Sequence, residues 1–270
     1  MPLAERYRTA FVTGASSGLG RAFAAMLLAD GVRVWGTSRD PKRLEGFGAG
    51  FTPCALDLAQ GDAAEAAFAR AEAEAGGFDL VVNNAGYGLF GEFAETEWKV
   101  WEAQLTAMLS TTLRLARAAY AGMRGRERGC LVNVSSLAAE FPLPFMAGYN
   151  VAKAGLSALS ESLIFESRGS PVTILDFRPG DYRTAFNQAM LPLNSAPSAR
   201  TARAWRVLDQ MLRSAPPPER AAAHLRLALG RGRSGIVRSG SFFQAKVAPL
   251  AARVLPEAWK RAVQARYFGV

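Results

Sequence analysis

The sequence predicts an α/β fold: one doubly wound parallel sheet of about seven strands, with helices on both faces and a helical C-terminal extension. Short apolar segments alternate with longer segments of helical periodicity over the first two-thirds of the 270 residues. This alternation is typical of parallel strands joined by crossover helices. The apolar segments are nearly continuous, as expected for strands buried on both faces. Polar and glycine-rich runs follow several of them, where such sheets bind ligands.

The predicted strands are short apolar runs that end at glycine or polar residues. The first ends at Thr13-Gly14, and the fourth ends at Asn83-Asn84. The seventh spans only Gly235-Ile236-Val237. Strands are expected at 9–12, 32–37, 51–56, 78–82, 130–134, 172–177 and 235–237.

The predicted helices carry apolar residues at helical spacing, and glycine or proline marks their ends. Helices are expected at 19–29, 62–75, 97–123, 149–168 and 219–229. After Gly180 the regular alternation stops: residues 184–213 suggest two short helices, and 242–268 suggest helices interrupted at Pro249 and Pro256. No repeat or linker appears, so we expect one domain over 1–270, with 242–270 as its helical extension.

Composition favours a globular protein of the cytoplasm. Half of the residues are hydrophobic and 20% are charged, and no apolar run is long enough to span a membrane. The N-terminus lacks the apolar stretch of a signal peptide. Cys54 and Cys130, the only cysteines, suggest buried thiols rather than a disulfide or metal site. His224, the only histidine, lacks the partners for a metal site or a catalytic triad.

Positive charge is concentrated near the C-terminus. Residues 178–270 contain 16 Lys and Arg but four Asp and Glu, a net charge of +12 in a chain of net charge +9. A solvated basic surface is the simplest interpretation. Acidic substrates or an anionic membrane are the alternatives. No nucleic-acid motif accompanies these residues, so we expect no nucleic-acid binding.

A glycine-rich turn joins the first strand to the first helix. The segment Thr13-Gly14-Ala15-Ser16-Ser17-Gly18-Leu19-Gly20 lets the backbone turn tightly and approach a pyrophosphate. The N-terminus of the following helix offers free N–H groups and a positive dipole end to the phosphates. This strand–turn–helix context predicts a Rossmann-type dinucleotide site.

The spacing of three motifs resembles that of the short-chain dehydrogenase/reductase family over residues 8–185. The motifs are Gly14-x-x-x-Gly18-x-Gly20, Asn83-Asn84-Ala85-Gly86, and Tyr149-x-x-x-Lys153 with Ser136 thirteen residues upstream. The resemblance implies a homodimer or homotetramer formed through the long helices. It also implies cofactor contacts at Gly14, Ser16, Ser17, Gly18, Leu19, Gly20, Ser38, Arg39, Asp57, Leu58, Asn83, Ala85, Gly86, Tyr149, Lys153, Pro179, Gly180 and Thr184.

The end of the second strand favours NADP(H) over NAD(H). An enzyme specific for NAD usually has an acidic residue there, which binds the ribose hydroxyls. This chain has Gly36-Thr37-Ser38-Arg39 instead. The Arg39 guanidinium can pair with a 2′-phosphate, and Lys42 and Arg43 add positive potential. A solvated Arg39 with no such role is the alternative.

The family resemblance also implies catalytic roles for Ser136, Tyr149 and Lys153. Hydride would pass between the nicotinamide and a carbonyl or alcohol carbon. Ser136 would hydrogen-bond the carbonyl oxygen, and Tyr149 would act as the general acid or base. Lys153 shares a helix face with Tyr149, lies near enough to lower the tyrosine pKa, and would hold the nicotinamide ribose. No metal is implied.

One position departs from the family pattern. Met108 occupies the place on the long helix where the family usually has an asparagine that supports a water relay behind the lysine. A thioether cannot form such a relay. Ser110, Thr111 or Thr112 could replace it, solvent could reach Lys153 by another path, or the enzyme could be slow or inactive. A non-enzymatic NADP(H) sensor is therefore a competing hypothesis.

Residues 185–213 are expected to cover the substrate, because the family usually closes this segment over the site. An apolar cover suits a hydrophobic ketone, aldehyde or alcohol, although a helix or subunit contact would use the same residues. The apolar residues are Phe186, Met190, Leu191, Leu193, Trp205, Val207, Leu208, Met211 and Leu212, with Phe90, Phe93, Phe141 and Phe145 beside them. Residues 242–270 mix apolar and basic side chains, which suits an anionic membrane, a partner subunit or the chain's own domain.

Overall fold

The computed structural model describes residues 2–184, 186, 190, 198–252 and 254–270. Its centre is a parallel sheet of seven strands in the order β3-β2-β1-β4-β5-β6-β7, which confirms the predicted fold class. The order reverses between β1 and β4, and this switch point is where such sheets bind ligands. The strands are β1 (Thr9–Val12), β2 (Arg33–Ser38), β3 (Phe51–Ala55), β4 (Leu80–Asn83), β5 (Gly129–Val134), β6 (Val172–Pro179) and β7 (Gly235–Ser239).

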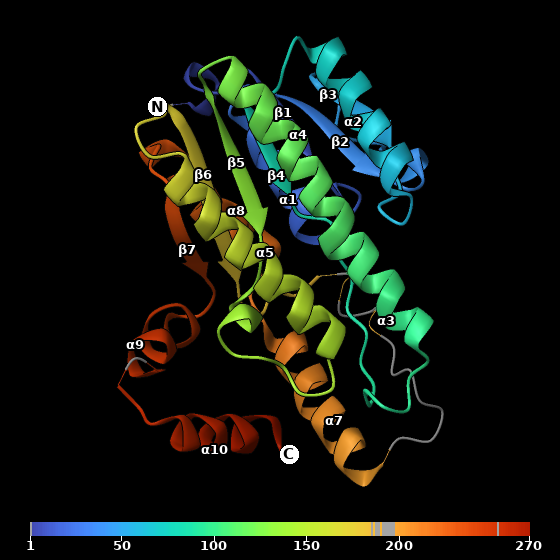
Figure 1. The fold of residues 1–270 in the computed structure, drawn as a ribbon, viewed down its shortest axis with the longest axis vertical. Coiled ribbons are helices and arrows are strands. Elements are labelled where there is room, and N and C mark those ends of the chain that lie inside the picture. Colours follow the sequence, from blue (N-terminus) through green and yellow to red (C-terminus); the bar gives the residue numbers. More distant parts are fainter. Residues whose placement is uncertain (1, 185, 187–189, 191–197, 253) are drawn as a thin grey trace.

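Helices cover both faces of the sheet (Figure 1). One layer consists of α1 (Gly18–Ala29) and α8 (Pro218–Arg231), which pack against each other. The opposite layer consists of α2 (Gly61–Ala75), α4 (Thr111–Gly125) and α5 (Ala147–Glu166). Two separate apolar cores result, because successive residues of a strand point to opposite faces. Val12 belongs to the core under α1 and α8, whereas Phe11 packs on Phe68 of α2.

The long helix predicted at 97–123 is helical throughout but is not one uniform α-helix. It consists of α3 (Trp98–Leu105), a π-helical turn (Thr106–Ser110) and α4. A π-turn inserts one extra residue into the helix, and such turns are frequent at functional sites. Met108 lies inside this turn and is buried.

The C-terminal third differs from expectation at Pro249. Of the two short helices expected in 184–213, the described residues contain the amphipathic helix α7 (Ala199–Ser214), while most of 185–197, including Leu191 and Leu193, lies outside the described residues. The extension consists of a π-turn (Phe243–Val247), α9 (Ala248–Ala252) and α10 (Glu257–Phe268). The break at Pro256 is confirmed. The interruption expected at Pro249 is not found, because Pro249 lies in a helical run that continues from the π-turn into α9.

The extension packs on its own domain at several points. Phe268 at the end of α10 is buried, and Gln264 donates a hydrogen bond to the Pro142 carbonyl (2.7 Å). Figure 1 shows α7, α9 and α10 below the carboxyl ends of the strands. The extension therefore closes the same end of the sheet at which the predicted site residues lie.

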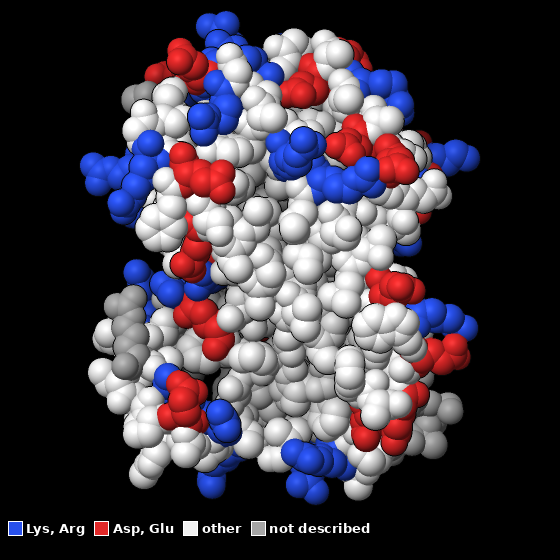
Figure 2. Space-filling view, in the orientation of Figure 1, with Lys and Arg blue, Asp and Glu red and all other residues white. Residues whose placement is uncertain are grey.

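The remaining sequence predictions concern single residues and the surface. Cys130 is buried, Cys54 is half-buried, and both thiols are free. His224 is half-buried on α8 and hydrogen-bonds the Ser239 hydroxyl (2.8 Å). Within the described part of the chain, every helix is too short or too polar to cross a bilayer. Figure 2 shows a broad uncharged band in the centre of the face that carries α4 and α5.

Candidate active site

The glycine turn after β1 has a conformation that other residues could not easily adopt. Gly14 and Gly18 have φ angles of +70° and +54°, in the left-handed region that favours glycine. A Cβ on Gly20 would lie 2.2 Å from the Gly14 carbonyl oxygen. Helix α1 begins at Gly18, and its N-cap residue Ser17 makes no side-chain capping hydrogen bond. The first N–H groups of α1 are thus available to phosphate oxygens, so the turn fits a dinucleotide.

The segment after β4 is tied to this turn through Thr13. The Thr13 hydroxyl accepts hydrogen bonds from the backbone N–H groups of Asn84 and Ala85 (both 2.9 Å). The Asn84 side chain donates to the Thr13 carbonyl (2.9 Å). Asn83 points elsewhere: its buried amide donates to the Asn133 side chain (3.0 Å). Of the two asparagines, Asn84 therefore supports the turn, while Asn83 joins β4 to β5.

Arg39 follows the end of β2 and is exposed. The charges of Arg39 and Asp57 both act on the pKa of Tyr87, a residue that the sequence analysis did not predict. Burial raises the pKa of Tyr87, with a smaller raising effect from Asp57, while the Arg39 charge lowers that pKa. Asp57 also accepts a hydrogen bond from the Ala59 N–H (3.0 Å). Arg39 and Asp57 thus lie near enough to Tyr87 for their charges to act on its pKa.

The remaining sequence-predicted cofactor residues border the same turn or pack beneath it. A Cβ on Gly18 would lie 3.2 Å from Thr184 Cβ, so the segment after β6 touches the start of α1. A Cβ on Gly86 would lie 3.7 Å from Lys153 Nζ. Leu58 packs against the core under α2. Ser38 and Pro179 are buried at strand ends, and Ser16, Ser17, Leu19 and Gly180 are half-buried.

Ser136, Tyr149 and Lys153 meet beyond the carboxyl end of β5. The Ser136 side chain hydrogen-bonds the Tyr149 hydroxyl. The Ser136 hydroxyl also donates a hydrogen bond to the Pro179 carbonyl oxygen (3.4 Å). Lys153 Nζ lies 5.7 Å from the Tyr149 ring centroid and donates to the Val134 carbonyl (2.7 Å). The structure therefore assembles the three residues that the sequence motif suggested.

The pKa of Tyr149 differs from expectation. It is raised to about 12, because burial disfavours the phenolate more than the Ser136 hydrogen bond favours it, and the charge of Asp181 raises it further. The predicted lowering by Lys153 is not found here. The ammonium group instead donates to the Val134 carbonyl. At neutral pH Tyr149 therefore keeps its proton.

Burial lowers the pKa of Lys153, whereas it raises the pKa of Tyr149. The ammonium is almost completely buried, and this lowers its pKa to about 8, while the negative charge of Asp176 on β6 raises it. Desolvation penalises whichever form is charged. Asp176 is thus the group that helps Lys153 to remain protonated near neutral pH.

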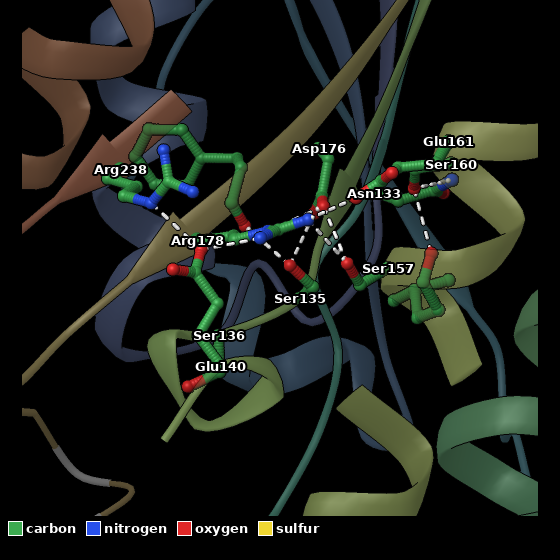
Figure 3. Close-up of polar contacts among 12 residues, drawn as sticks. Asn133, Ser135, Ser136, Glu140, Ser157, Ser160, Glu161, Asp176, Arg178 and Arg238 are labelled. Atoms are coloured by element: carbon green, nitrogen blue, oxygen red, sulfur yellow. Dashed lines mark hydrogen bonds and ion pairs between the residues drawn. The ribbon is translucent and has the colours of Figure 1, made fainter. Parts of the chain in front are cut away.

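Asp176 belongs to a buried polar network that the sequence analysis missed (Figure 3). Its carboxylate accepts hydrogen bonds from Ser135, from Ser157 (2.8 Å) and from Arg178 Nε (2.7 Å). Arg178 also pairs with Glu140 (2.5 Å) and Glu161 (2.8 Å). Two charged residues at alternate positions of an otherwise apolar strand share one face, which is the sequence pattern that could have indicated this network.

Ser110, Thr111 and Thr112 are the residues near Met108 that could replace the water relay behind Lys153. Ser110 is exposed, Thr112 donates to the Ala107 carbonyl of its own helix (3.3 Å), and a Cβ on Gly61 of α2 would lie 3.4 Å from the Thr111 hydroxyl. In the part of the chain that the structure describes, no hydrogen bond or ion pair joins any of these three to Lys153. Met108 itself packs on the segment after β4, since its sulfur accepts from the Tyr87 N–H (3.5 Å).

One turn earlier, Gln104 is completely buried and was not predicted. Its amide nitrogen donates to the Tyr87 carbonyl (2.9 Å), and its oxygen has no partner among the described residues. A Cβ on Gly148, the residue before Tyr149, would lie 2.4 Å from this oxygen. Gln104 therefore holds the Tyr87 segment in place beside the start of α5.

An apolar cluster covers Tyr149. The rings of Tyr149 and Phe186 have centroids 5.8 Å apart, and a Cβ on Gly88 would lie 2.8 Å from Phe186 and 2.7 Å from Met190. The cluster comprises Phe90, Leu143, Phe145, Met146, Tyr149, Phe186, Met190, Ala204, Trp205, Leu208, Leu212 and Val270. Phe93 and Phe141 are outside it, and Phe93 is exposed. The described residues contain no group of His, Cys, Asp and Glu able to hold a metal ion.

Comparisons with known proteins agree with this geometry. The family model described as short chain dehydrogenase matches residues 8–193. An uncharacterized oxidoreductase of Myxococcus xanthus is 38% identical over 69% of this chain and 78% of its own length. A 3-ketodihydrosphingosine reductase of Bacteroides thetaiotaomicron is 30% identical over 88% of this chain and 87% of its own.

Among solved structures, a short-chain dehydrogenase from Streptomyces avermitilis superposes with a TM-score of 0.82 at 28% identity, covering 97% of this chain and 98% of that one. Other structures of the same fold contain NAD or NADP. The matched segment includes the glycine turn and all three residues that meet beyond β5. The chain belongs to the short-chain dehydrogenase/reductase family of oxidoreductases.

Proposed function

We propose that the protein is an NADPH-dependent reductase or dehydrogenase that interconverts a carbonyl and an alcohol on a hydrophobic substrate. The assembly of Ser136, Tyr149 and Lys153 at the glycine-turn end of the sheet carries this proposal. The residues around the turn fit a dinucleotide, and a bound NADPH would supply the hydride. Turnover of ketones and aldehydes, followed by the NADPH absorbance, tests the proposal, and inactivity on a broad panel would favour the sensor hypothesis.

Each residue of the site has a distinct task in this proposal. The Ser136 hydroxyl donates a hydrogen bond to the substrate carbonyl oxygen and stabilises the negative charge that develops there. Tyr149 transfers its phenolic proton to that oxygen and takes it back in the oxidative direction. Its high pKa in this structure favours proton retention until negative charge appears on the substrate. Lys153 holds the nicotinamide ribose with its ammonium group.

The apolar cluster over Tyr149 supports a hydrophobic substrate. Phe186 and Met190 lie directly over the segment after β4, and Phe90 and Trp205 pack against each other beside them (5.1 Å between centroids). A site of this kind binds by burial of apolar surface, with a few polar groups that orient the reacting carbon. The similarity to a 3-ketodihydrosphingosine reductase agrees with a hydrophobic ketone.

Arg39 supports the preference for NADPH. We expect Arg39→Ala to lower kcat/KM for NADPH about 10- to 100-fold and to leave that for NADH nearly unchanged. A hydrogen bond to a charged group contributes about 1.5–3 kcal/mol, and only NADPH carries the 2′-phosphate. Initial rates with each cofactor measure the effect.

Arg33 provides the matched control for Arg39. It lies at the opposite end of β2, with its guanidinium 5.5 Å from the Trp35 ring centroid. Arg33→Ala should leave the ratio of the two kcat/KM values unchanged. A tenfold preference of the wild type for NADH would contradict the assignment.

We also propose that a second copy of the chain packs against the uncharged band over α4 and α5 in Figure 2. Val151 and Phe165 of α5 are exposed, as is Leu113 of α4. Exposed apolar side chains gathered on two neighbouring helices favour contact with another protein surface. A homodimer or homotetramer formed by these helices follows from this proposal.

The outer face of the C-terminal extension supports peripheral contact with an anionic membrane. Phe242, Leu250, Val254 and Trp259 are all exposed, and an apolar groove of ≈ 430 Å³ lies between Phe242 and Val254. Basic residues accompany them at Lys246, Arg261 and Arg266. Such a surface binds by apolar insertion and by attraction to acidic headgroups.

Vesicles test this contact. We expect the protein to sediment with vesicles that contain phosphatidylserine and to bind pure phosphatidylcholine more weakly. Leu250→Glu should reduce sedimentation severalfold, whereas Leu227→Glu, at an exposed leucine of α8, should not. If the wild type stays in the supernatant at low salt, the proposed membrane contact is wrong.

A further inference from the structure

Asp181 places a carboxylate at the edge of the active site, two residues beyond Pro179. It is half-buried, and its Oδ2 accepts a hydrogen bond from the Gln244 side chain (2.5 Å). No other hydrogen-bond donor reaches it from the described residues. Burial accordingly raises the pKa of Asp181, and the Gln244 hydrogen bond only partly opposes this. A second donor, supplied by a ligand, would satisfy the carboxylate.

The position of Asp181 places it beside the reacting groups. Its charge raises the pKa of Tyr149, and the Ser136 hydroxyl bonds the carbonyl of Pro179 on the same short segment. A Cβ on Gly180 would lie 2.8 Å from Gln244 Oε1 and 3.0 Å from Leu137. The Asp181–Gln244 pair therefore lies beside Leu137 and next to the strand end that contacts Ser136, and the effect of its charge on Tyr149 agrees with this placement.

The C-terminal extension holds this pair in place. Gln244 lies on the π-turn after β7, and its backbone N–H donates to the Ser241 hydroxyl (3.2 Å). Tyr267 of α10 hydrogen-bonds Gln244, and its pKa is raised by burial and by the charge of Asp181. The carboxylate is thus positioned by two elements of the extension, while Phe186 and Met190 make the cover of the site apolar.

We propose that Asp181 is a specificity-determining residue that accepts a hydrogen bond from an ammonium or hydroxyl group next to the reacting carbonyl of an otherwise apolar substrate. This inference rests on the proposed carbonyl reduction. A buried acceptor that loses its donor is left unpaired, so a site of this kind discriminates against analogues that lack the donor. A carboxylate on the substrate would meet like charge at this position, which disfavours keto acids.

Three probes of equal chain length test the inference: a long-chain 2-amino-3-ketone, the corresponding ketone without the amine, and a long-chain 3-keto acid. For the wild type we expect kcat/KM to be at least about tenfold higher for the amino ketone than for the plain ketone, as a charge-assisted hydrogen bond predicts. The keto acid should be the poorest substrate. Asp181→Asn should lower the rate with the amino ketone about tenfold or more and change the plain ketone less than about threefold.

Two further variants separate recognition from folding. Asp181→Glu keeps the charge and should restore part of the preference. Asp209→Asn removes a carboxylate that pairs with Arg213 on α7 and should leave all three rates unchanged. An equal ratio of amino ketone to plain ketone in the wild type and in Asp181→Asn would overturn the role of Asp181 while leaving the reductase assignment intact. Failure of the wild type to reduce any probe would overturn both.

Discussion

Tyr149→Phe is expected to lower kcat about 100-fold or more while NADPH binds almost as tightly as in the wild type. General acid catalysis by a positioned side chain contributes about 10²–10⁴-fold, and phenylalanine has no proton to donate. The ring that packs on Phe186 is retained, so the apolar cluster loses no volume. Steady-state rates and NADPH fluorescence titration measure the two quantities separately.

Tyr120→Phe is the matched control for this experiment. Its hydroxyl accepts a hydrogen bond from Arg124 on α4 (3.3 Å), remote from the site. Removal of that hydroxyl should leave kcat unchanged. Rates like those of the wild type in Tyr149→Phe would show that another group supplies the proton, and the mechanism proposed above would have to be abandoned.

Asp176→Asn is expected to destabilise the fold by about 3–5 kcal/mol, the usual cost of removing one partner from a buried ion pair. The carboxylate is completely buried and accepts from Ser135, Ser157 and Arg178. An asparagine side chain would present an N–H₂ group to at least one of these donors. Chemical denaturation of both proteins measures the difference in the free energy of unfolding.

The same substitution should change the pH dependence of activity. Burial has already lowered the pKa of Lys153 to about 8, and Asp176 opposes this effect. Without Asp176 the pKa of Lys153 falls further, so Lys153 loses its charge at a lower pH. We expect the alkaline limb of kcat/KM for ketone reduction to move to lower pH by roughly one unit.

Glu161→Gln distinguishes this electrostatic effect from simple loss of packing. Glu161 pairs with the same arginine, but its side chain is 50% exposed. Its removal should cost less than about 1 kcal/mol and leave the alkaline limb in place. A pH profile of Asp176→Asn that matches that of the wild type would mean that Asp176 has only a structural role.

The sequence by itself determined the fold class and the identity of the motifs. Nearly continuous apolar strands, separated by helical segments, are compatible with few architectures other than a parallel sheet covered on both faces. The glycine turn and the Tyr149–Lys153 spacing could also be recognised directly, because they depend on local backbone geometry. These features lie close together in the chain, where sequence patterns are most informative.

The tertiary structure alone decided what surrounds those motifs. Asp176 and Asp181 come from β6 and the segment after it, and their partners lie on α5 and on the C-terminal extension. The pKa of Tyr149 is raised rather than lowered because burial, which depends on the whole fold, outweighs the local hydrogen bond. Desolvation and pairing arise from residues far apart in the chain, so the motif could indicate the proposed catalytic groups but could not reveal their electrostatic environment.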